Sequence, residues 1–425
     1  MVFTKKCNFA QKHYVRTVYS FLIQLVWYFL QIIAKFNQKI KYFVEGRKRT
    51  FATLEAELSS SNKLIWIHVA SLGEYEQGLP ILEQLKIRYP NYKVLLTFFS
   101  PSGFEVKKDK TPADVVVYLP MDSTHNTKRF LEITKPKLAI FIKYEIWPNY
   151  LNELQKRSIP TLLVSGIFSP RQVFFKWYGS FMRKSLNAFT HFFVQDDKSK
   201  RLLNEINFQN VTVSGDTRFD RVSKILQSDN SLEFMEVFKG KSKCLVVGSS
   251  WPEDEAVLLD YINESNVNLK FVIAPHNIKQ KHIEGLKNSI EKRVMLHSQI
   301  DLNTIADYQV LLIDAIGILT KIYSYADFAY VGGGFATGLH NTLEPAVFGI
   351  PVIIGPQYSG FNEAVEMVNR KGILVVNNKK DFETKMKDLL ENPQLSKTTG
   401  NNNLNYIQAQ TGASTKVIDC IQSLL

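Results

Sequence analysis

The sequence predicts an α/β protein built from two Rossmann-like domains, and three observations support this prediction. The chain has 425 residues, more than a single hydrophobic core usually serves. Short apolar runs alternate with amphipathic stretches, which is typical of buried parallel strands joined by helices. The alternation occurs twice, and the polar stretch KGKSK at 239–243 separates the two series.

The first series contains six apolar runs expected to be strands, at 64–70, 93–99, 113–120, 138–143, 161–166 and 191–195. The second series contains five more, at 244–250, 269–275, 310–314, 328–333 and 350–355. We therefore expect an anchor region at 1–50, a first domain at 51–220 and a second domain with C-terminal helices at 221–425. A helical tail of this kind, from Asp381 onward, can return to brace the first domain.

Composition and charge narrow the range of partners. Apolar residues make up 45% of the chain and charged residues 22%, as in ordinary folded proteins. The 52 Lys and Arg against 40 Asp and Glu give a formal charge of +12, which favours anionic lipid, phosphorylated substrates or nucleic acid. Cys7, Cys244 and Cys420 are too widely spaced for a disulfide framework or a metal-binding pair, which indicates a reducing compartment.

An apolar segment at 18–34 precedes the first series and has basic residues on both sides. Gln24 and Gln31 interrupt it, so it either spans a membrane marginally or lies in the interface. No small-residue cleavage site follows it, which argues against a signal peptide. The alternative is a buried amphipathic helix of the first domain. The basic run 47–49 is expected to add charge near anionic headgroups.

Turns that follow strands are the expected ligand sites in open α/β sheets. In the first such turn, HVASLGEYEQG at 68–78, Glu74 lies near the start of a helix, where the helix dipole favours its ionised form. A carboxylate there can accept a proton from an attacking hydroxyl. The alternative is that Glu74 or Glu76 caps the helix. His68 is expected to be a packed strand residue rather than a base.

The second turn is IKYEIWPNYL at 142–151, with Pro148 in or near the first turn of a helix. Glu145 beside Trp147 indicates a ligand that carries a sugar or hydroxyl group. The alternative is a structural hydrogen bond from nearby backbone amides to Glu145.

The third turn, at 330–356, holds a glycine run followed by His340, Asn341 and Glu344. Glycines allow backbone amides to approach an anion, the next helix start adds its dipole, and Glu344 can bind ribose hydroxyls. A plain tight turn explains the glycines as well. The chain contains no Walker A motif, no G-x-G-x-x-G at the first strand and no His/Cys cluster, so no metal, no cofactor and no nucleic acid is expected.

Taken together, these motifs resemble the 3-deoxy-D-manno-octulosonic acid (Kdo) transferases of lipopolysaccharide biosynthesis. The landmarks that carry the resemblance are WIHVASLGE, YLPMDS, RFLEITKP, YEIWPNYL, SGIFSPR, VSGDTRFDR, IAPHNIK, LLIDAIGILTKIYSYADFAYVGGG and HNTLEPAVFGIPVIIGP. The resemblance implies the two-domain GT-B glycosyltransferase architecture, with the nucleotide in the second domain and the acceptor facing the first.

The resemblance also implies roles for individual residues. The family's proton-accepting glutamate corresponds to Glu74, and its second acidic position corresponds to Glu145. A family lysine in a G-N-x-K-F-D motif corresponds to Arg218. The CMP contacts correspond to Pro275, His276, Ile316, Gly317, Ile318, Asn341, Thr342, Leu343 and Glu344.

Two of these contacts depart from the family pattern. The chain has Pro-His-Asn at 275–277, where the family usually has Pro-Arg-His, and Ile-Gly-Ile at 316–318, where the family has Met-Gly-Glu. A phosphate-binding arginine is therefore expected to be missing, and both departures affect the nucleotide contacts more than the fold.

The implied activity is inverting transfer of Kdo from CMP-Kdo to the lipid A precursor, at the cytoplasmic face of the cell inner membrane. The expected partners are CMP-Kdo, the lipid A precursor and the inner-membrane lipid surface. Two alternatives stay open. One is another GT-B enzyme with a different nucleotide sugar, and the other is a membrane scaffold that kept the fold without the activity.

Overall fold

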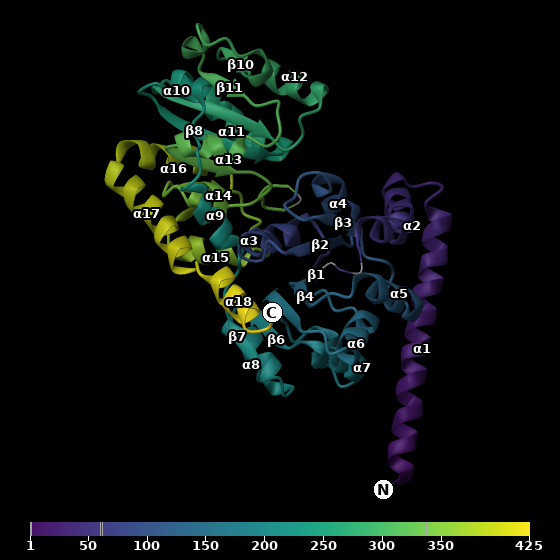
Figure 1. The fold of residues 1–425 in the computed structure, drawn as a ribbon. Coiled ribbons are helices and arrows are strands. Elements are labelled where there is room, and N and C mark those ends of the chain that lie inside the picture. Colours follow the sequence, from purple (N-terminus) through teal and green to yellow (C-terminus); the bar gives the residue numbers. More distant parts are fainter. Residues whose placement is uncertain (1, 60, 62, 337) are drawn as a thin grey trace. The chain divides into compact units, whose positions relative to one another are not determined.

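The computed structural model describes residues 2–59, 61, 63–336 and 338–425, with side chains described from residue 16 onward in these ranges. The chain divides into two compact units (Figure 1). The first contains the residues up to Arg221 together with Thr411–Leu425, and the second contains Val222–Gln410. Each unit holds one seven-stranded parallel sheet, which confirms the predicted α/β class with two Rossmann-like domains.

The sheet of the first unit has the order β3-β2-β1-β4-β5-β6-β7. Its strands are β1 Lys63–Val69, β2 Tyr92–Phe98, β3 Val115–Tyr118, β4 Leu138–Ile142, β5 Thr161–Gly166, β6 His191–Val194 and β7 Val211–Val213. The helices of this unit are α1 Val2–Ile33, α2 Gln38–Glu57, α3 Leu72–Arg88, α4 Pro101–Lys107, α5 Thr124–Thr134, α6 Pro148–Lys156, α7 Ser180–Ser185, α8 Asp197–Glu205 and α18 Ala413–Gln422. The division between the units falls within α9, Arg218–Ile225.

The sheet of the second unit has the order β10-β11-β9-β8-β12-β13-β14. Its strands are β8 Lys243–Ser250, β9 Leu269–Pro275, β10 Val294–Leu296, β11 Val310–Leu312, β12 Phe328–Val331, β13 Val352–Ile354 and β14 Ile373–Val375. Its helices are α10 Glu233–Lys239, α11 Pro252–Glu264, α12 Gln280–Ser289, α13 Leu319–Ile322, α14 Leu343–Ala346, α15 Asn362–Asn369, α16 Lys379–Glu391 and α17 Pro393–Ala409.

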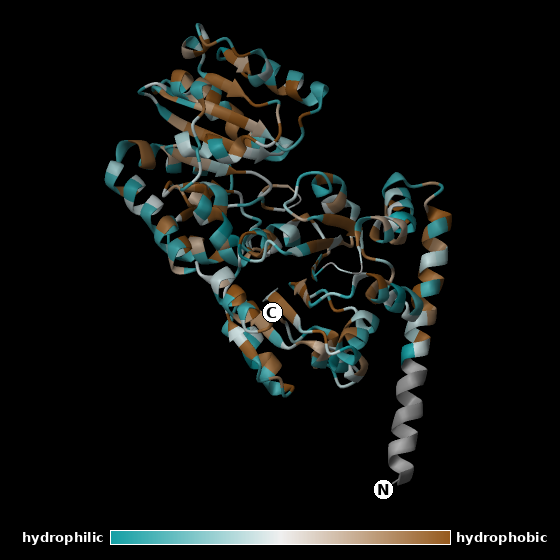
Figure 2. Ribbon diagram, viewed as in Figure 1, coloured by the Kyte–Doolittle hydropathy of each residue, from teal (hydrophilic) through white to brown (hydrophobic). Residues whose placement is uncertain are grey.

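The strand β1 shows why the strands read as unbroken apolar runs in the sequence. Leu64 and Trp66 join the core on one face of the sheet, whereas Ile65, Ile67 and Val69 join the core on the other face. Because helices cover both faces of a parallel sheet, neither side of the strand needs polar residues. Figure 2 shows this concentration of apolar residues in the strands.

Three strands were not predicted from the sequence: β7, β10 and β14. Each has three residues, and each lies at an edge of its sheet. An apolar run this short has no distinctive period, so the pairing partner in the folded sheet decides whether it becomes a strand.

The helix α1 presents its apolar side chains to solvent. Its stretch Arg16–Ile33 is long and apolar enough to cross a membrane by length and composition, and no part of that stretch is buried. Phe21, Tyr28 and Phe29 are each more than half exposed. A buried core helix, the alternative left open by the sequence, does not fit these exposures.

A polar face of α1 is bonded to the rest of the first unit. Arg16 Nε donates to Asn149 Oδ1 at 2.8 Å, and the Tyr19 hydroxyl donates to Asp122 Oδ2 at 3.0 Å. The fully buried Asp122 also accepts from the backbone amides of Asn149 and Tyr150 at the start of α6. The apolar helix is therefore fixed to the helix that follows Glu145.

The expectation that Arg47 adds surface charge is wrong. Arg47 is 4% exposed, and its guanidinium donates to the carbonyl oxygens of Leu119, Phe43 and Phe99. Burial lowers the pKa of Arg47 to about 9. Within the run 47–49, Arg47 thus joins α2 to the ends of two strands, while its two neighbours are exposed.

The C-terminal residues Thr411–Leu425 group with the first unit, which differs from the expected assignment of all of 221–425 to the second domain. Val417, Ile418 and Ile421 of α18 are buried in the core beside β1 and α3. Asp220 accepts hydrogen bonds from the backbone amide of Gly412 and from the amide and hydroxyl of Ser414. Apolar burial and this carboxylate together hold the tail on the first unit.

We expect Asp220→Ala to release the C-terminal helix, because two backbone amides and a hydroxyl lose their shared acceptor. The cost is on the order of 2 kcal/mol. The variant should show a lower apparent melting temperature and faster proteolytic cleavage near residue 411. Asp419→Ala, at an exposed position of α18, is the matched control. If both variants behave alike, Asp220 does not anchor the tail.

Candidate active site

The two acidic residues singled out in the sequence lie at the carboxyl edge of the first sheet. Glu74 is in the first turn of α3, which follows β1, and Glu145 is in the loop between β4 and α6. Since β1 and β4 are paired neighbours, their carboxyl ends bring the two loops together. The electrostatic influence of Glu145 on Glu74 reflects this proximity.

Glu74 is a buried carboxyl group, and one of its two oxygens accepts a hydrogen bond from the protein. Its Oε2 accepts the backbone N–H of Ala70 at 2.5 Å; Ala70 precedes the N-cap residue Ser71, so this bond does not cap the helix as the sequence alternative supposed. Within the described residues, Oε1 has no protein partner. Burial raises the pKa of Glu74 to about 7, the charge of Glu145 adds to the rise, and the Ala70 amide and Lys143 oppose it. Near neutral pH such a group both accepts and releases a proton readily.

Glu145 is held by an indole rather than by backbone amides. The Nε1–H of Trp147 lies 3.1 Å from Glu145 Oε2 and also 3.1 Å from Nε2 of His68. The same His68 nitrogen lies 3.6 Å from Glu145 Oε2. A structural hydrogen bond to Glu145 is thus present, but its donor is the Trp147 side chain and not one of the backbone amides that the sequence alternative named. The Glu145 side chain is 13% exposed.

The hydrogen-bond partners of His68 determine where its proton lies. An indole N–H only donates, so Nε2 of a neutral His68 accepts from Trp147 and the ring proton is on Nδ1. Nδ1 then donates to the Thr97 hydroxyl at 2.8 Å, which also accepts from Trp66 Nε1. His68 is fully buried in β1, as expected for a packed strand residue, and through Trp147 it also fixes the loop of Glu145.

Lys143 is a residue of this edge that the sequence reasoning missed. It follows β4 directly and has φ +67, a left-handed conformation that is unusual for a residue with a side chain. Its amide donates to the Val164 carbonyl oxygen at 2.8 Å, which holds this conformation in place. Strained backbone of this kind gathers at functional sites. A lysine directly after an apolar strand was the available sequence signal.

Arg218 lies in the first unit, whereas the other expected donor-binding residues lie in the second. Its guanidinium pairs with the buried carboxylate of Asp216, with nitrogen–oxygen distances of 2.8 and 2.9 Å. Asp216 also accepts from Gln77 on α3 at 3.1 Å. This charge is therefore fixed to the helix that carries Glu74.

In the second unit, the expected CMP contacts lie at or just after the carboxyl ends of strands. Pro275 is the last residue of β9, and the His276 amide donates to the Ser250 carbonyl oxygen at 2.9 Å. Glu344 accepts from Asn341 at 3.0 Å and from Thr320 at 2.8 Å, and Thr320 lies in α13, the short helix that follows Ile316–Ile318. The structure thus connects two segments that are far apart in the sequence.

The side chains of these two segments differ in how exposed they are to a ligand. Ile316 is 84% exposed and Gly317 has φ +97, whereas Thr342 and Leu343 are buried and pack in the core. Ile318 precedes the short helix α13. Any contact with a ligand by Thr342 or Leu343 is therefore a contact of the backbone.

The glycine run of the third turn serves backbone packing. A Cβ atom on Gly332 would lie 2.3 Å from the Ser249 carbonyl oxygen, and one on Gly334 would lie 2.7 Å from Gly355. The amides of Gly332 and Gly333 donate to the Gly248 carbonyl oxygen and to Asp254. These two amides are therefore not free to bind an anion, because the protein already uses them.

Three rings form a cluster at the ends of the neighbouring strands β8, β9 and β12. Trp251 stacks on His276 with centroids 4.5 Å apart and an interplanar angle of 16°. Trp251 Nε1 donates to His340 Nε2 at 3.0 Å. Trp251 was not singled out from the sequence, where a tryptophan before a proline gave no functional signal.

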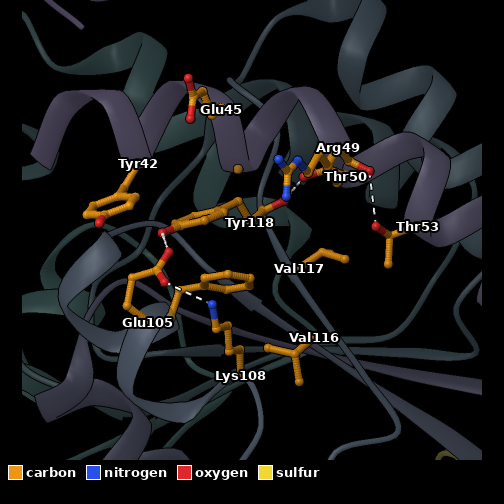
Figure 3. Close-up of a pocket in the computed structure, with 12 residues that line it drawn as sticks. Tyr42, Glu45, Arg49, Thr50, Thr53, Glu105, Lys108, Val116, Val117 and Tyr118 are labelled. Atoms are coloured by element: carbon orange, nitrogen blue, oxygen red, sulfur yellow. Dashed lines mark hydrogen bonds and ion pairs between the residues drawn. The ribbon is translucent and has the colours of Figure 1, made fainter. Parts of the chain in front are cut away.

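A separate cavity of about 360 Å³ lies between α2, α4 and β3. Figure 3 shows its polar groups bonded to one another: Tyr118 donates to Glu105 at 3.2 Å, and Lys108 donates to the same carboxylate at 3.0 Å. Neither Glu74 nor Glu145 lines it. Glu74 and Glu145 lie instead at the carboxyl edge of the first sheet, where, within the described residues, one oxygen of each carboxylate has no protein partner.

Within the described residues, no group of three or more His, Cys, Asp or Glu side chains is arranged to hold a metal ion.

Comparisons with known proteins find sequence similarity to one family of transferases. A family model described as 3-deoxy-D-manno-octulosonic-acid transferase (kdotransferase) matches residues 45–221. The chain is 29% identical to the 3-deoxy-D-manno-octulosonic acid transferase of Aquifex aeolicus, covering 81% of this chain and 91% of that protein. It is 27% identical to the transferase of the same name from Haemophilus influenzae, covering 85% and 87%, and 29% identical to that of Rickettsia felis, covering 79% and 74%.

Solved structures share the fold at low sequence identity. The UDP-GlcNAc 2-epimerase of Neisseria meningitidis has a TM-score of 0.59 and 16% identity, over 85% of this chain and all of that one. MurG of Acinetobacter baumannii has a TM-score of 0.52 and 13% identity, over 85% and 99%. These likenesses show the two-domain GT-B fold.

We expect Glu74→Gln to stabilise the protein at high pH. Because the folded-state pKa of Glu74 is raised from 4.5 to about 7, the folded protein binds more protons than the unfolded chain between these values, and stability falls as pH rises through this window. The variant should gain on the order of 2 kcal/mol at pH 8 and little at pH 4.5.

Thermal unfolding at both pH values measures this difference, with Glu205→Gln, at an exposed position of α8, as the control. If the Glu74→Gln protein is less stable than wild type at pH 8, burial of the ionised Glu74 carboxylate does not destabilise the fold.

Proposed function

We propose that this chain, which is similar over most of its length to 3-deoxy-D-manno-octulosonic acid (Kdo) transferases, is the glycosyltransferase that moves Kdo from CMP-Kdo to the lipid A precursor in lipopolysaccharide biosynthesis. The observation that carries this proposal is the state of Glu74. It is a buried carboxyl group with a pKa of about 7 and one oxygen without a protein partner, at the carboxyl edge of a Rossmann-like sheet.

Glu74 is the general base in the proposed reaction. The free oxygen of Glu74 takes the proton of an acceptor sugar hydroxyl. At the same time the hydroxyl oxygen of the acceptor attacks the anomeric carbon of Kdo. The bond from this carbon to the phosphate oxygen breaks, and CMP leaves with the electron pair. Direct displacement of this kind inverts the configuration at the anomeric carbon. A carboxylate whose pKa lies near the working pH is a stronger base than an ordinary glutamate.

Glu145 supports the base through its charge. The Glu145 carboxylate raises the pKa of Glu74, and Trp147 and His68 hold it in place by hydrogen bonding. Lys143 and Arg218 supply positive charge at the same edge, which favours an anionic substrate. The arrangement thus combines a tuned base with attraction for phosphorylated or carboxylated sugars.

The acceptor is a membrane lipid in this proposal, and α1 brings the enzyme to it. The exposed apolar side chains of α1 enter the bilayer or its interface, and Lys35, Lys39 and Lys41 contact anionic headgroups. The hydrogen bonds from α1 to Asp122 and Asn149 support this proposal, because they tie the apolar helix to the first unit. We propose that the enzyme works at the cytoplasmic face of the inner membrane.

We expect Glu74→Gln to abolish most of the transfer, because the base is lost while the fold is kept. The rate should fall about 10²- to 10⁴-fold. In the wild-type enzyme the rate should fall tenfold per pH unit well below pH 7, as Glu74 becomes protonated. Mass spectrometry of lipid A precursor incubated with CMP-Kdo and the protein in detergent measures the donor, the acceptor and the number of Kdo units added.

Glu205→Gln is the control and should keep the wild-type rate. A Glu74→Gln enzyme with wild-type rate would remove Glu74 from the role of base. Product formation from a uridine nucleotide sugar but not from CMP-Kdo would favour the alternative of a different GT-B enzyme. Calorimetric titration with CMP and UDP separates these two cases before any turnover is measured.

We expect Leu22→Lys combined with Phe29→Lys to weaken membrane binding, because each lysine costs about 3 kcal/mol near the centre of an apolar segment. The pair Gln38→Lys and Ala56→Lys adds the same charge at exposed positions of α2 and should bind normally. Sedimentation with vesicles of anionic phospholipid measures the bound fraction. Equal binding of both double variants would mean that α1 does not carry the attachment.

A further inference from the structure

The expected anion site in the second unit has fewer free donors than the glycine run suggested. The amides of Gly332 and Gly333 donate within the protein, and α14 has only four residues, too few for a helix dipole of useful size. The expected phosphate-binding arginine is replaced by His276. A side chain at this edge is therefore a candidate to add a donor for an anionic ligand.

His340 is placed to supply that donor. It follows the glycine turn after β12, and its backbone amide donates to the Gly332 carbonyl oxygen at 3.1 Å. The Nε2 atom of its ring accepts a hydrogen bond from Trp251 Nε1, with 3.0 Å between the two nitrogens. An indole nitrogen has a hydrogen and no lone pair to offer, so Nε2 must be the accepting nitrogen and the proton of the neutral ring is on Nδ1.

The ring of His340 is kept neutral by its surroundings. Burial lowers the pKa of His340, the neighbouring His276 lowers it further, and Asp254 opposes this only weakly. Asp254 itself is committed to the Trp251 amide, the Gly333 amide and the Tyr330 hydroxyl. At neutral pH, His340 is thus an uncharged ring with a single N–H.

Trp251 is held rigidly, so it can hold His340 in turn. Its amide donates to Asp254 Oδ2 at 3.0 Å, and Pro252 starts α11 directly after it. The exposed ring of His276 stacks on one face of the indole and lies 4.7 Å from the ring of His340. The planes of Trp251 and His340 differ by 15°, which makes the bonded pair one flat surface.

We propose that Trp251 is a positioning residue that fixes His340 with its proton on Nδ1, and that this N–H donates to an anionic oxygen of the nucleotide-sugar donor, either the phosphate or the sugar carboxylate. Within the described residues, Nδ1 of His340 has no protein partner. This inference rests on the proposed function, since it names a further contact of the same donor site. A donor fixed before the ligand arrives costs little reorganisation when it binds.

Binding of CMP and cytidine to the full-length protein in detergent tests this assignment. The amide nitrogen of an asparagine overlaps Nδ1 of a histidine, whereas that of a glutamine overlaps Nε2. His340→Asn should therefore bind CMP within about threefold of wild type, and His340→Gln should bind it about 10- to 100-fold more weakly, the range for a hydrogen bond to a charged group. Cytidine, which has no phosphate, should bind all three proteins equally.

The ligand whose binding is weakened by His340→Gln shows whether the anionic oxygen belongs to the phosphate or to the sugar carboxylate. A loss for CMP but not for cytidine identifies the phosphate. A loss that appears only as a higher KM for CMP-Kdo identifies the carboxylate. If His340→Gln weakens CMP, cytidine and CMP-Kdo equally, or none of them, the inference is overturned. If wild-type protein binds neither CMP nor CMP-Kdo, the proposed function fails instead.

The role of Trp251 has its own readout in the nitrogen-15 spectrum of histidine-labelled protein, in which His340→Gln identifies the signal. Wild-type His340 should show the Nδ1–H tautomer. Trp251→Phe keeps a ring for His276 to stack on but removes the indole N–H, so it should shift this signal toward a mixture of tautomers and weaken CMP binding. Trp177→Phe, at a tryptophan that is 92% exposed, should change neither. A Trp251→Phe spectrum identical to wild type at His340 would refute the positioning role.

Discussion

Burial of both faces of two parallel sheets is the constraint on which the rest of this structure depends. Because helices cover each face, the strands carry apolar side chains in both directions, and polar chemistry has to emerge where the strands end. Glu74, Lys143 and Glu145 all follow strands of the first sheet, and Trp251, His276 and His340 follow strands of the second. The order of the strands, rather than closeness in sequence, decides which of these residues meet.

Within the first unit, the same burial sets the chemistry of the carboxyl groups. Glu74 is removed from water and lies near a second carboxylate, and both effects favour its protonated form. Such a group reduces the stability of the fold at high pH, and it is the base that we propose for the reaction. The cost is limited because one oxygen of Glu74 is bonded to the Ala70 amide.

A recurring arrangement in both units is an indole that donates to a buried or half-buried imidazole. Trp147 donates to His68 in the first unit, and Trp251 donates to His340 in the second. In each case the indole decides which ring nitrogen carries the proton, since an indole cannot accept. Polar side chains at the open edges of the sheets are thus fixed before a substrate arrives.

The sequence by itself determined the fold class, the long strands and the two loops that carry Glu74 and Glu145, because apolar runs and strand-ending turns are local patterns. Only the tertiary structure decided the rest. The short edge strands depend on their pairing partners. The return of α18 depends on Asp220 and on an apolar surface that the first sheet provides. The burial of Arg47 depends on three carbonyl oxygens, two of which belong to residues more than 50 positions away in the sequence. The glycines at 332–334 read as an anion site in sequence, yet they serve contacts with Ser249 and Gly355. Long-range contacts of this kind leave no periodic signal in one chain, which is the physical reason why they could not be predicted.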